Sequence, residues 1–311
     1  MSVRLSVIIP GYNTPEAWWK RCVDSVLKAI GPEDEIVLVD DGSREGLKVS
    51  EFESLKGLDD RIRIMTKANG GLSSARNAAL DVVSGQYVAF VDSDDVVSPE
   101  VYSKSIAAME SFGSDVAIFG VRTEWVEERL YKDDIPQLCD YQSLSPVDVK
   151  QLSDDCLMNY AWNKVYRTGF LQMHQLRFDP EGMPCEDIIF NLQCVMAGAR
   201  WCTVDCLGYV YYRTAMTLLS KYRPGNFAGL HHGSETWKKY KDMTPGAREV
   251  LGWRGEATEA SIIAAERRNR LRPGSPCWWL AVPYNLLRTI LYCRPLRRRH
   301  LKKMWPQIRD L

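Results

Sequence analysis

The chain has 311 residues, of which 45% are hydrophobic and 26% are charged. This composition is that of a globular protein with material for one large core or two modest ones, and it excludes a disordered chain. The formal charge is zero, yet residues 261–311 carry twelve Arg and Lys against two acids, which leaves a net charge of −10 on residues 1–260. Because most of the chain is acidic and no nucleic-acid motif is present, we expect no nucleic-acid partner.

The nine cysteines are scattered without a Cys-x-x-Cys pair, and the first residues show no secretory signal. Cys202 and Cys206 lie four residues apart, but only His174 is anywhere near them, which argues against a zinc site. We therefore expect reduced thiols in a cytoplasmic protein.

Short apolar runs alternate with helical patterns over the first 120 residues. Strands are predicted at 4–10, 35–39, 62–65, 87–91 and 116–119, and helices after Pro15, over 72–83 and after Pro99. This alternation is typical of an α/β fold, with a mostly parallel, doubly wound sheet and helices on both faces.

The strand predicted at 87–91 ends in Asp92, Ser93, Asp94 and Asp95. Ligands of open α/β sheets bind beyond the carboxyl ends of the strands, where these acids would lie. Neighbouring carboxylates repel each other unless a cation compensates them, and oxygen ligands suit Mg²⁺ or Mn²⁺ bound to a diphosphate. The alternative is a polar turn that caps the next helix.

The turns after the first two strands suggest a base pocket. The first turn lacks the Gly-x-Gly-x-x-Gly pattern of a dinucleotide site and carries Tyr12, whose ring could stack on a base. Asp40 or Asp41, after the second strand, could accept a hydrogen bond from a base imide. For Tyr12 alone, a packed loop aromatic is the alternative.

Two clusters follow in the second half of the chain. The first contains Trp162 and Lys164, and a Trp is often a core residue. In the second, Glu186 and Asp187 open a helix predicted to end near residue 196, where they could also merely complement the helix dipole.

Taken in order, the motifs SVIIPGYN, VLVDDGS, ANGGLSSARNAAL, YVAFVDSDD, WNKVYR, CEDIIF and YVYYR resemble those of family 2 inverting glycosyltransferases, which have the nucleotide-sugar-binding GT-A fold. The resemblance covers about residues 3–220. It implies a catalytic domain over 1–222, with a nucleotide-sugar half over about 1–120 and an acceptor half over about 121–222. A helical, basic and aromatic C-terminal extension is expected over 223–311.

The resemblance also implies roles for individual residues. Asp187 would be the general base, and Asp94 would bind the divalent metal, Mn²⁺ or Mg²⁺. Glu186, Trp162 and Lys164 would lie on the acceptor side. The donor, a UDP-sugar, would be bound by Pro10, Tyr12, Asp40, Asp41, Asn69, Arg76, Asp92, Ser93 and Arg213.

Two features bear on the acceptor. Processive synthases of this family carry Gln-x-x-Arg-Trp, but here Ala197 precedes Arg200 and Trp201, so we expect transfer of a single sugar. The aromatic segment 276–293 is flanked by basic residues, so that 267–303 fits a peripheral contact with an anionic inner leaflet. The alternative is a packed helical hairpin or an oligomer contact.

The sequence thus predicts a cytoplasmic, membrane-associated transferase that moves one sugar, with inversion, from a UDP-sugar to a glycan. We expect the glycan to be lipid-linked and to belong to a bacterial surface polysaccharide. A nucleotidyltransferase and a nucleotide-sugar-binding subunit without turnover are the alternatives.

Overall fold

The computed structural model describes residues 3–213, except for positions 56, 128, 146–147, 150, 153–156 and 181–185. The chain divides into two compact units, and all described residues belong to the first, which comprises 1–182 and 186–215. The predicted extension 223–311, with its segment 267–303, lies outside the described residues. Within the described part, no helix is long and apolar enough to cross a membrane.

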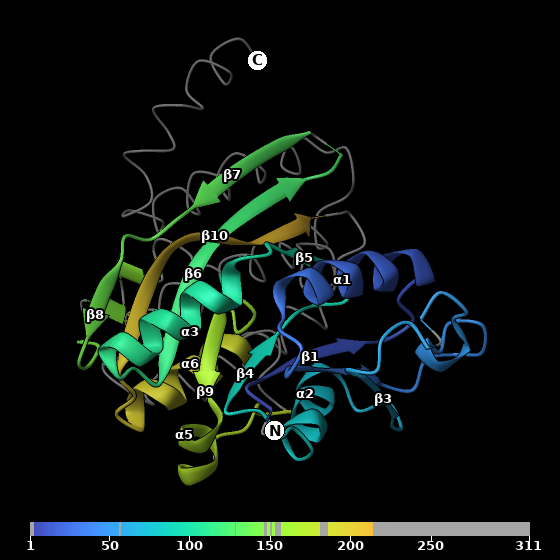
Figure 1. Ribbon diagram of the computed structural model, residues 1–311, viewed down its shortest axis with the longest axis horizontal. Coiled ribbons are helices and arrows are strands. Elements are labelled where there is room, and N and C mark those ends of the chain that lie inside the picture. Colours follow the sequence, from blue (N-terminus) through green and yellow to red (C-terminus); the bar gives the residue numbers. More distant parts are fainter. Residues whose placement is uncertain are drawn as a thin grey trace, which may run out of the picture. The chain divides into compact units, whose positions relative to one another are not determined.

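The first half is the predicted alternation of strands and helices (Figure 1). Strands β3, β2, β1 and β4 lie in this order and are all parallel. The helix predicted over 72–83 ends earlier, at Leu80. The elements are β1 (Leu5–Gly11), α1 (Glu16–Ala29), β2 (Glu35–Asp40), the 3₁₀ turn η1 (Val49–Glu51), β3 (Ile62–Thr66), α2 (Leu72–Leu80) and β4 (Tyr87–Phe90).

The second half extends the same sheet with mixed strand directions. Strand β9 runs antiparallel between β4 and β6, whereas β10 runs parallel to β6. The sheet order is β3-β2-β1-β4-β9-β6-β10-β5. The elements are β5 (Val96–Val97), α3 (Val101–Phe112), β6 (Val116–Trp125), β7 (Leu130–Asp134), β8 (Cys139–Tyr141), β9 (Lys164–Arg167), α5 (Thr168–Met173), α6 (Glu186–Met196) and β10 (Trp201–Arg213).

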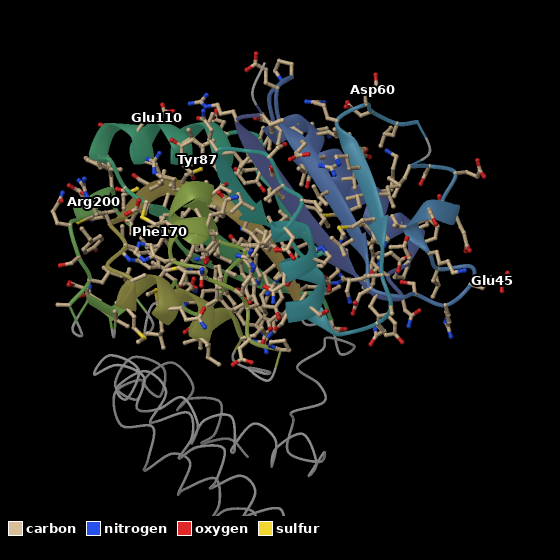
Figure 2. The ribbon with its side chains drawn as sticks, turned by 90° about the horizontal axis from the view of Figure 1, so that it is seen from below. Glu45, Asp60, Tyr87, Glu110, Phe170 and Arg200 are labelled. Atoms are coloured by element: carbon tan, nitrogen blue, oxygen red, sulfur yellow. The ribbon has the colours of Figure 1, made fainter. Side chains whose placement is uncertain are left out.

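Helices cover both faces of the sheet, as predicted. Helices α1 and α3 contact each other on one face. On the other face, Phe90 of β4 meets the rings of Phe178 and of Phe190 in α6. The inward-facing side chains of the strands are buried; Tyr87, for example, is 2% exposed. Glu45, by contrast, lies at the periphery in Figure 2 and is exposed. The core therefore lies along the sheet, and the strand ends are left to polar loops.

Gly11, the last residue of β1, lets α1 pack directly beneath the sheet edge. A Cβ at this position would lie 2.3 Å from Cζ2 of the buried Trp19. Because glycine has no Cβ, the indole of Trp19 can occupy this space, and the turn after β1 packs closely against α1. This packing brings Tyr12 and Asn13 to the edge where the parallel strands end.

Candidate active site

The ends of β1, β2 and β4 lie side by side, because these strands pair in parallel register. Gly11 is opposite Asp40, and the amide of Val91 donates to the carbonyl of Ile8. The polar turns predicted after each strand therefore meet at one edge of the sheet, where ligands of such folds bind.

The first of these turns places Tyr12 in solvent, 55% exposed, with its ring available for stacking. Pro10, two residues earlier, is buried inside β1. Thr14 joins this turn to the β4 end through a hydrogen bond of 2.8 Å between its hydroxyl and that of Ser93. The buried Ser93 thus helps to hold the two loops together.

Asp40 and Asp41 shape their own loops. The two carboxylate oxygens of Asp40 accept the amides of Ser43 at 2.8 Å and Val49 at 3.0 Å, and the residue is 1% exposed. These contacts assign Asp40 to bracing the loop and do not support its predicted contact with a base.

Asp41 gathers the segment that leads into α2. It accepts the Gly71 amide at 2.7 Å and the Lys67 ammonium at 2.7 Å, while Nδ2 of Asn69 donates to its backbone carbonyl at 2.9 Å. Asn69 itself is exposed. Asp41 therefore holds Asn69 beside the end of β2.

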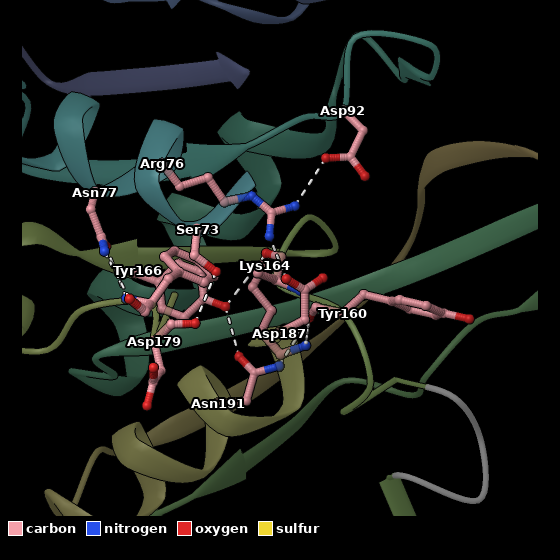
Figure 3. A network of polar contacts seen from close by, with 12 residues as sticks. Ser73, Arg76, Asn77, Asp92, Tyr160, Lys164, Tyr166, Asp179, Asp187 and Asn191 are labelled. Atoms are coloured by element: carbon pink, nitrogen blue, oxygen red, sulfur yellow. Dashed lines mark hydrogen bonds and ion pairs between the residues drawn. The ribbon is translucent and has the colours of Figure 1, made fainter. Parts of the chain in front are cut away.

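Arg76 of α2 joins the acid that follows β4 to the acid that opens α6 (Figure 3). One guanidinium nitrogen donates to Asp92 at 2.9 Å and the other donates to Asp187. The side chain is fully buried, and its Cζ lies 5.0 Å from the ring centroid of Phe178. Within the described part of the chain, the Nε of Arg76 has no hydrogen-bond partner. Arg76 is therefore a fixed positive charge between two candidate catalytic acids.

Burial removes Arg76 and Asp92 from water, and the opposite charges of the cluster offset the cost of this desolvation. Burial alone would lower the pKa of Arg76, but Asp187, Asp92 and Glu186 together raise it. Burial raises the pKa of Asp92; Arg76 opposes this effect and Asp187 adds to it. The guanidinium thus keeps two neighbouring carboxylates together that would otherwise repel each other.

Asp187 lies in the first turn of α6, held on both carboxylate oxygens. Oδ1 accepts from Arg76 and Oδ2 accepts the amide of Ala161 at 3.1 Å. Its side chain is 13% exposed. Each carboxylate oxygen has a second lone pair, so Asp187 can still accept a proton from a hydroxyl group.

Glu186, the preceding residue, is buried at 7% exposure, and its Oε2 has no hydrogen-bond partner among the described residues. Burial, and next the negative charge of Asp187, raise the pKa of Glu186 from 4.5 to about 8. The carboxyl group therefore holds its proton to a higher pH in the folded protein than in the unfolded chain.

This raised pKa predicts a pH-dependent effect of Glu186→Gln. Because folding raises the pKa of Glu186, its burial does not lower the free energy of unfolding below pH 4.5. As the pH rises from 4.5 to about 8, the free energy of unfolding falls. Glutamine stays neutral, so the variant should unfold at a temperature up to about 10 °C higher than the wild type at pH 9. At pH 5 the two should unfold alike. Thermal unfolding followed by circular dichroism measures both values.

Glu110→Gln is the matched control, because Glu110 is an exposed helix residue that pairs only with Arg4 among the described residues. It should leave the unfolding temperature nearly unchanged at both pH values. A Glu186→Gln variant no more stable than wild type at pH 9 would show that Glu186 is not held neutral by its surroundings.

Asp94 and Asp95 differ in their surroundings although they are adjacent. Asp95 is fully buried and accepts the Tyr209 hydroxyl at 2.8 Å and the Tyr212 amide at 2.8 Å, which ties β10 to the β4 end. Asp94 has no ion pair with a described side chain. Burial and then Asp92 raise the pKa of Asp94 to about 6.

This setting fits a divalent metal on Asp94. A bound cation would offset the raised pKa, and Mg²⁺ and Mn²⁺ commonly take one or two carboxylates and complete their shell with phosphate oxygens and water. Among the described residues, no group of three or more His, Cys, Asp or Glu could hold a metal on its own.

The three remaining predicted residues lie away from the carboxylate cluster or beneath it. Trp162 is 3% exposed and is stacked between Tyr160 and Tyr209, with ring centroids 4.3 and 4.1 Å away. Lys164 is fully buried and does not reach the surface on the acceptor side. Arg213 ends β10, with its Cζ 5.8 Å from the ring centroid of Trp125.

A cavity of about 450 Å³ opens beside Asp94, and sequence reasoning did not find it. The guanidinium Cζ of Arg21 lies 4.3 Å from the ring centroid of Tyr212 at its wall. Further lining residues are Trp18, Glu124, Trp125 and Tyr131. The aromatic residues before Arg213 are the one sequence signal for this cavity. Its other lining residues come from α1 and the β6–β7 hairpin, which are distant in the sequence.

The fold and the strand-end acids place the chain in a known class of proteins. Residues 6–171 match the model of "Glycosyl transferase family 2", so the chain belongs to this family. The protein has the GT-A fold, as predicted. The crystal structure of S. aureus TarS 1-349 in complex with UDP-GlcNAc is similar over 91% of this chain and 80% of that chain, with a TM-score of 0.59 at 19% identity.

Two curated relatives are similar in sequence. "Uncharacterized glycosyltransferase EpsJ" of Bacillus subtilis (strain 168) is 31% identical over 227 residues, which cover 71% of this chain and 64% of that protein. "Poly(ribitol-phosphate) beta-N-acetylglucosaminyltransferase TarS" of Staphylococcus aureus (strain Mu50) is 28% identical over 215 residues, which cover 67% of this chain and 35% of that protein. This chain therefore matches less than two thirds of the length of either relative.

Proposed function

We propose that this protein transfers a single sugar, with inversion, from a UDP-sugar to a glycan acceptor in the assembly of a bacterial surface polysaccharide. The observation that carries the proposal is the cluster of Arg76, Asp92 and Asp187 beside Asp94, at the strand ends of a family 2 fold. The family and the name of TarS support glycosyl transfer as the reaction class.

The donor would lie across the ends of β1, β2 and β4. The exposed ring of Tyr12 would stack on the uracil, and the loop organised by Asp41 and Asn69 would border it. Asp92 would contact the ribose and the sugar, since its side chain remains 27% exposed while it pairs with Arg76. The complex of TarS with UDP-GlcNAc makes this donor a reasonable first probe.

Asp94 would hold the metal that accompanies the diphosphate. A bound divalent ion supplies Lewis-acid stabilisation of the charge that develops on the leaving diphosphate. Arg213 would add positive charge on the same side, and Arg76 would fix the orientation of Asp92.

Asp187 would act as the general base. Inversion requires an acceptor hydroxyl to attack the anomeric carbon from the face opposite UDP, with a carboxylate within reach of its proton. Asp187 is anchored through both oxygens, yet it keeps lone pairs and some exposure for this contact. Glu186, whose raised pKa favours the protonated form, would donate a hydrogen bond to a hydroxyl of the acceptor or the donor.

The acceptor would approach from the cavity beside Asp94. Its walls combine the aromatic rings of Trp18, Trp125 and Tyr131 with charged groups of both signs. Aromatic faces pack against sugar rings while charged groups bind hydroxyls, which is the lining expected of a carbohydrate site.

We further propose that the glycan is lipid-linked and that segment 267–303 contacts the inner leaflet of the membrane. If the full-length protein does not bind anionic vesicles, this proposal is contradicted.

Calorimetric titration with UDP, with and without Mn²⁺, tests the donor site. We expect binding to the wild type to be at least about tenfold tighter with Mn²⁺, because Asp94 would hold an ion that offsets the negative charge of the diphosphate. Asp94→Ala should lose this difference and bind UDP equally weakly with and without Mn²⁺. UDP release from UDP-GlcNAc and other UDP-sugars would then identify the donor.

Asp133→Ala is the matched control, since Asp133 is a partly exposed carboxylate that pairs with Arg122 on the β6–β7 hairpin. Its affinity for UDP should respond to Mn²⁺ as that of the wild type does. Failure of the wild type to bind UDP in either condition would contradict the proposed donor.

A further inference from the structure

The segment formed by residues 157–161, here called the base-anchoring loop, presents one amide to Asp187, and its carbonyls accept hydrogen bonds from buried side chains. The amide is that of Ala161, which donates to Oδ2 of Asp187. The carbonyls of Leu157, Met158 and Tyr160 accept from buried side chains on β9 and α6. The loop is therefore held from below by side chains that do not touch the carboxylate (Figure 3).

Lys164 of β9 provides the strongest of these supports. Its ammonium donates to the carbonyl of Leu157 at 2.7 Å, to the carbonyl of Tyr160 at 2.5 Å and to Oδ1 of Asn163 at 2.8 Å. All three acceptors are neutral, and the side chain is 0% exposed. Three donated bonds require the protonated amine, so the loop geometry depends on a buried charge.

Among the described residues, Lys164 forms no direct ion pair, and its three acceptors are neutral. Burial lowers the pKa of Lys164 to about 7, while Asp187 and Cys194 act in the opposite direction. The ammonium group of Lys164 fixes the positions of its three acceptor oxygens. If one of these oxygens turned outward, a buried N–H group would lose its hydrogen bond.

Asn191 of α6 supports the loop from the other side. Its Nδ2 donates to the carbonyls of Met158 at 2.8 Å and Tyr160 at 3.1 Å, and its Oδ1 accepts the hydroxyl of Tyr166 at 2.8 Å. The side chain is 0% exposed, and every bond it can make to the loop is used. Asn191 and Lys164 therefore share the carbonyl of Tyr160, the residue directly before Ala161.

We propose that Lys164 and Asn191 are positioning residues for Asp187: by fixing the carbonyls of the base-anchoring loop, they aim the Ala161 amide at the carboxylate and set its orientation. Arg76 holds only Oδ1 of Asp187, which leaves rotation about that contact. The Ala161 amide removes this freedom through Oδ2. The assignment replaces direct acceptor contact as the role of Lys164, because its buried ammonium cannot meet a substrate.

Two variants test this assignment, and two measurements separate positioning from a general loss of structure. Lys164→Met keeps the length of the side chain, and Asn191→Leu keeps its approximate volume, while each removes the donors to the loop. Amide hydrogen exchange should quicken at residues 157–161 by at least about tenfold in both variants, with the strands of the sheet protected as in the wild type.

The second measurement is hydrolysis of UDP-GlcNAc, or of whichever UDP-sugar the wild type turns over, and this part depends on the proposed function. Misorientation of Asp187 should lower kcat up to about 100-fold while KM for the donor changes less than about twofold. Lys104→Met is the matched control, because Lys104 is a half-exposed helix lysine paired with Glu100. It should change neither exchange in the loop nor kcat.

Unchanged exchange at residues 157–161 in both variants would overturn the assignment. So would faster exchange with an unchanged kcat, since the loop would then not govern Asp187. If Lys164→Met does not fold, Asn191→Leu decides alone, because it retains the buried charge. A wild type that turns over no UDP-sugar would contradict the proposed function, whereas the exchange data would still decide whether these side chains hold the loop.

Discussion

Replacing Asp187 by asparagine should lower the rate of sugar transfer by about 10²- to 10⁴-fold, the range by which a positioned general base accelerates a reaction. The asparagine oxygen can still accept from Arg76, although the amide nitrogen cannot accept from Ala161, and the side chain cannot take a proton from the acceptor hydroxyl. UDP binding in the presence of Mn²⁺ should stay within about twofold of the wild type. UDP release in an acceptor assay and calorimetry measure the two quantities.

Asp81→Asn is the control for this substitution. Asp81 follows α2 with a side chain that is 63% exposed and pairs with Arg177. Because it lies outside the carboxylate cluster, transfer should be unaffected. Unchanged activity in Asp187→Asn would remove Asp187 as the base and leave Glu186 and Asp92 as the remaining carboxylates of the cluster.

Arg76→Met should destabilise the folded protein by about 3–5 kcal/mol, the usual cost of removing one partner from a buried ion pair. Methionine fills much of the space between Phe90 and Phe178 but leaves Asp92 and Asp187 facing each other without a cation. Urea-induced unfolding measures the loss. Transfer should also fall, because neither acid keeps its orientation.

The loss should depend on pH in a defined direction. Without the guanidinium, burial and the negative charge of Asp187 favour protonation of Asp92 in the folded state more than in the unfolded chain. Stability therefore falls as the pH rises through the folded-state values, so the deficit should be larger at pH 8 than at pH 5.

Arg177→Met supplies the comparison for Arg76. Its pair with Asp81 is exposed on both sides, and such pairs contribute about 0–1 kcal/mol. A cost for Arg76→Met no greater than that of Arg177→Met, or a deficit that does not change with pH, would show that Arg76 does not compensate the two acids.

Several features could be predicted from the sequence because they depend on local patterns. The alternation of short apolar runs with helical periods predicted the parallel half of the sheet, and the acids after the strand of residues 87–91 marked the ligand edge. Strand β9 did not stand out, because a four-residue segment containing a lysine and an arginine lacks an apolar pattern. Its place between β4 and β6 follows from pairing on both sides.

The sequence by itself determined the family, the order of most strands and helices, and which acids end a strand or open a helix, since these are properties of neighbouring residues. Only the tertiary structure decided what those residues contact. Arg76 meets an acid 111 positions away, Asp40 turns into its own loop, and Lys164 is enclosed beneath the loop that holds Asp187. Such contacts arise from long-range packing, which chooses among side chains of the same type by burial and direction rather than by spacing along the chain.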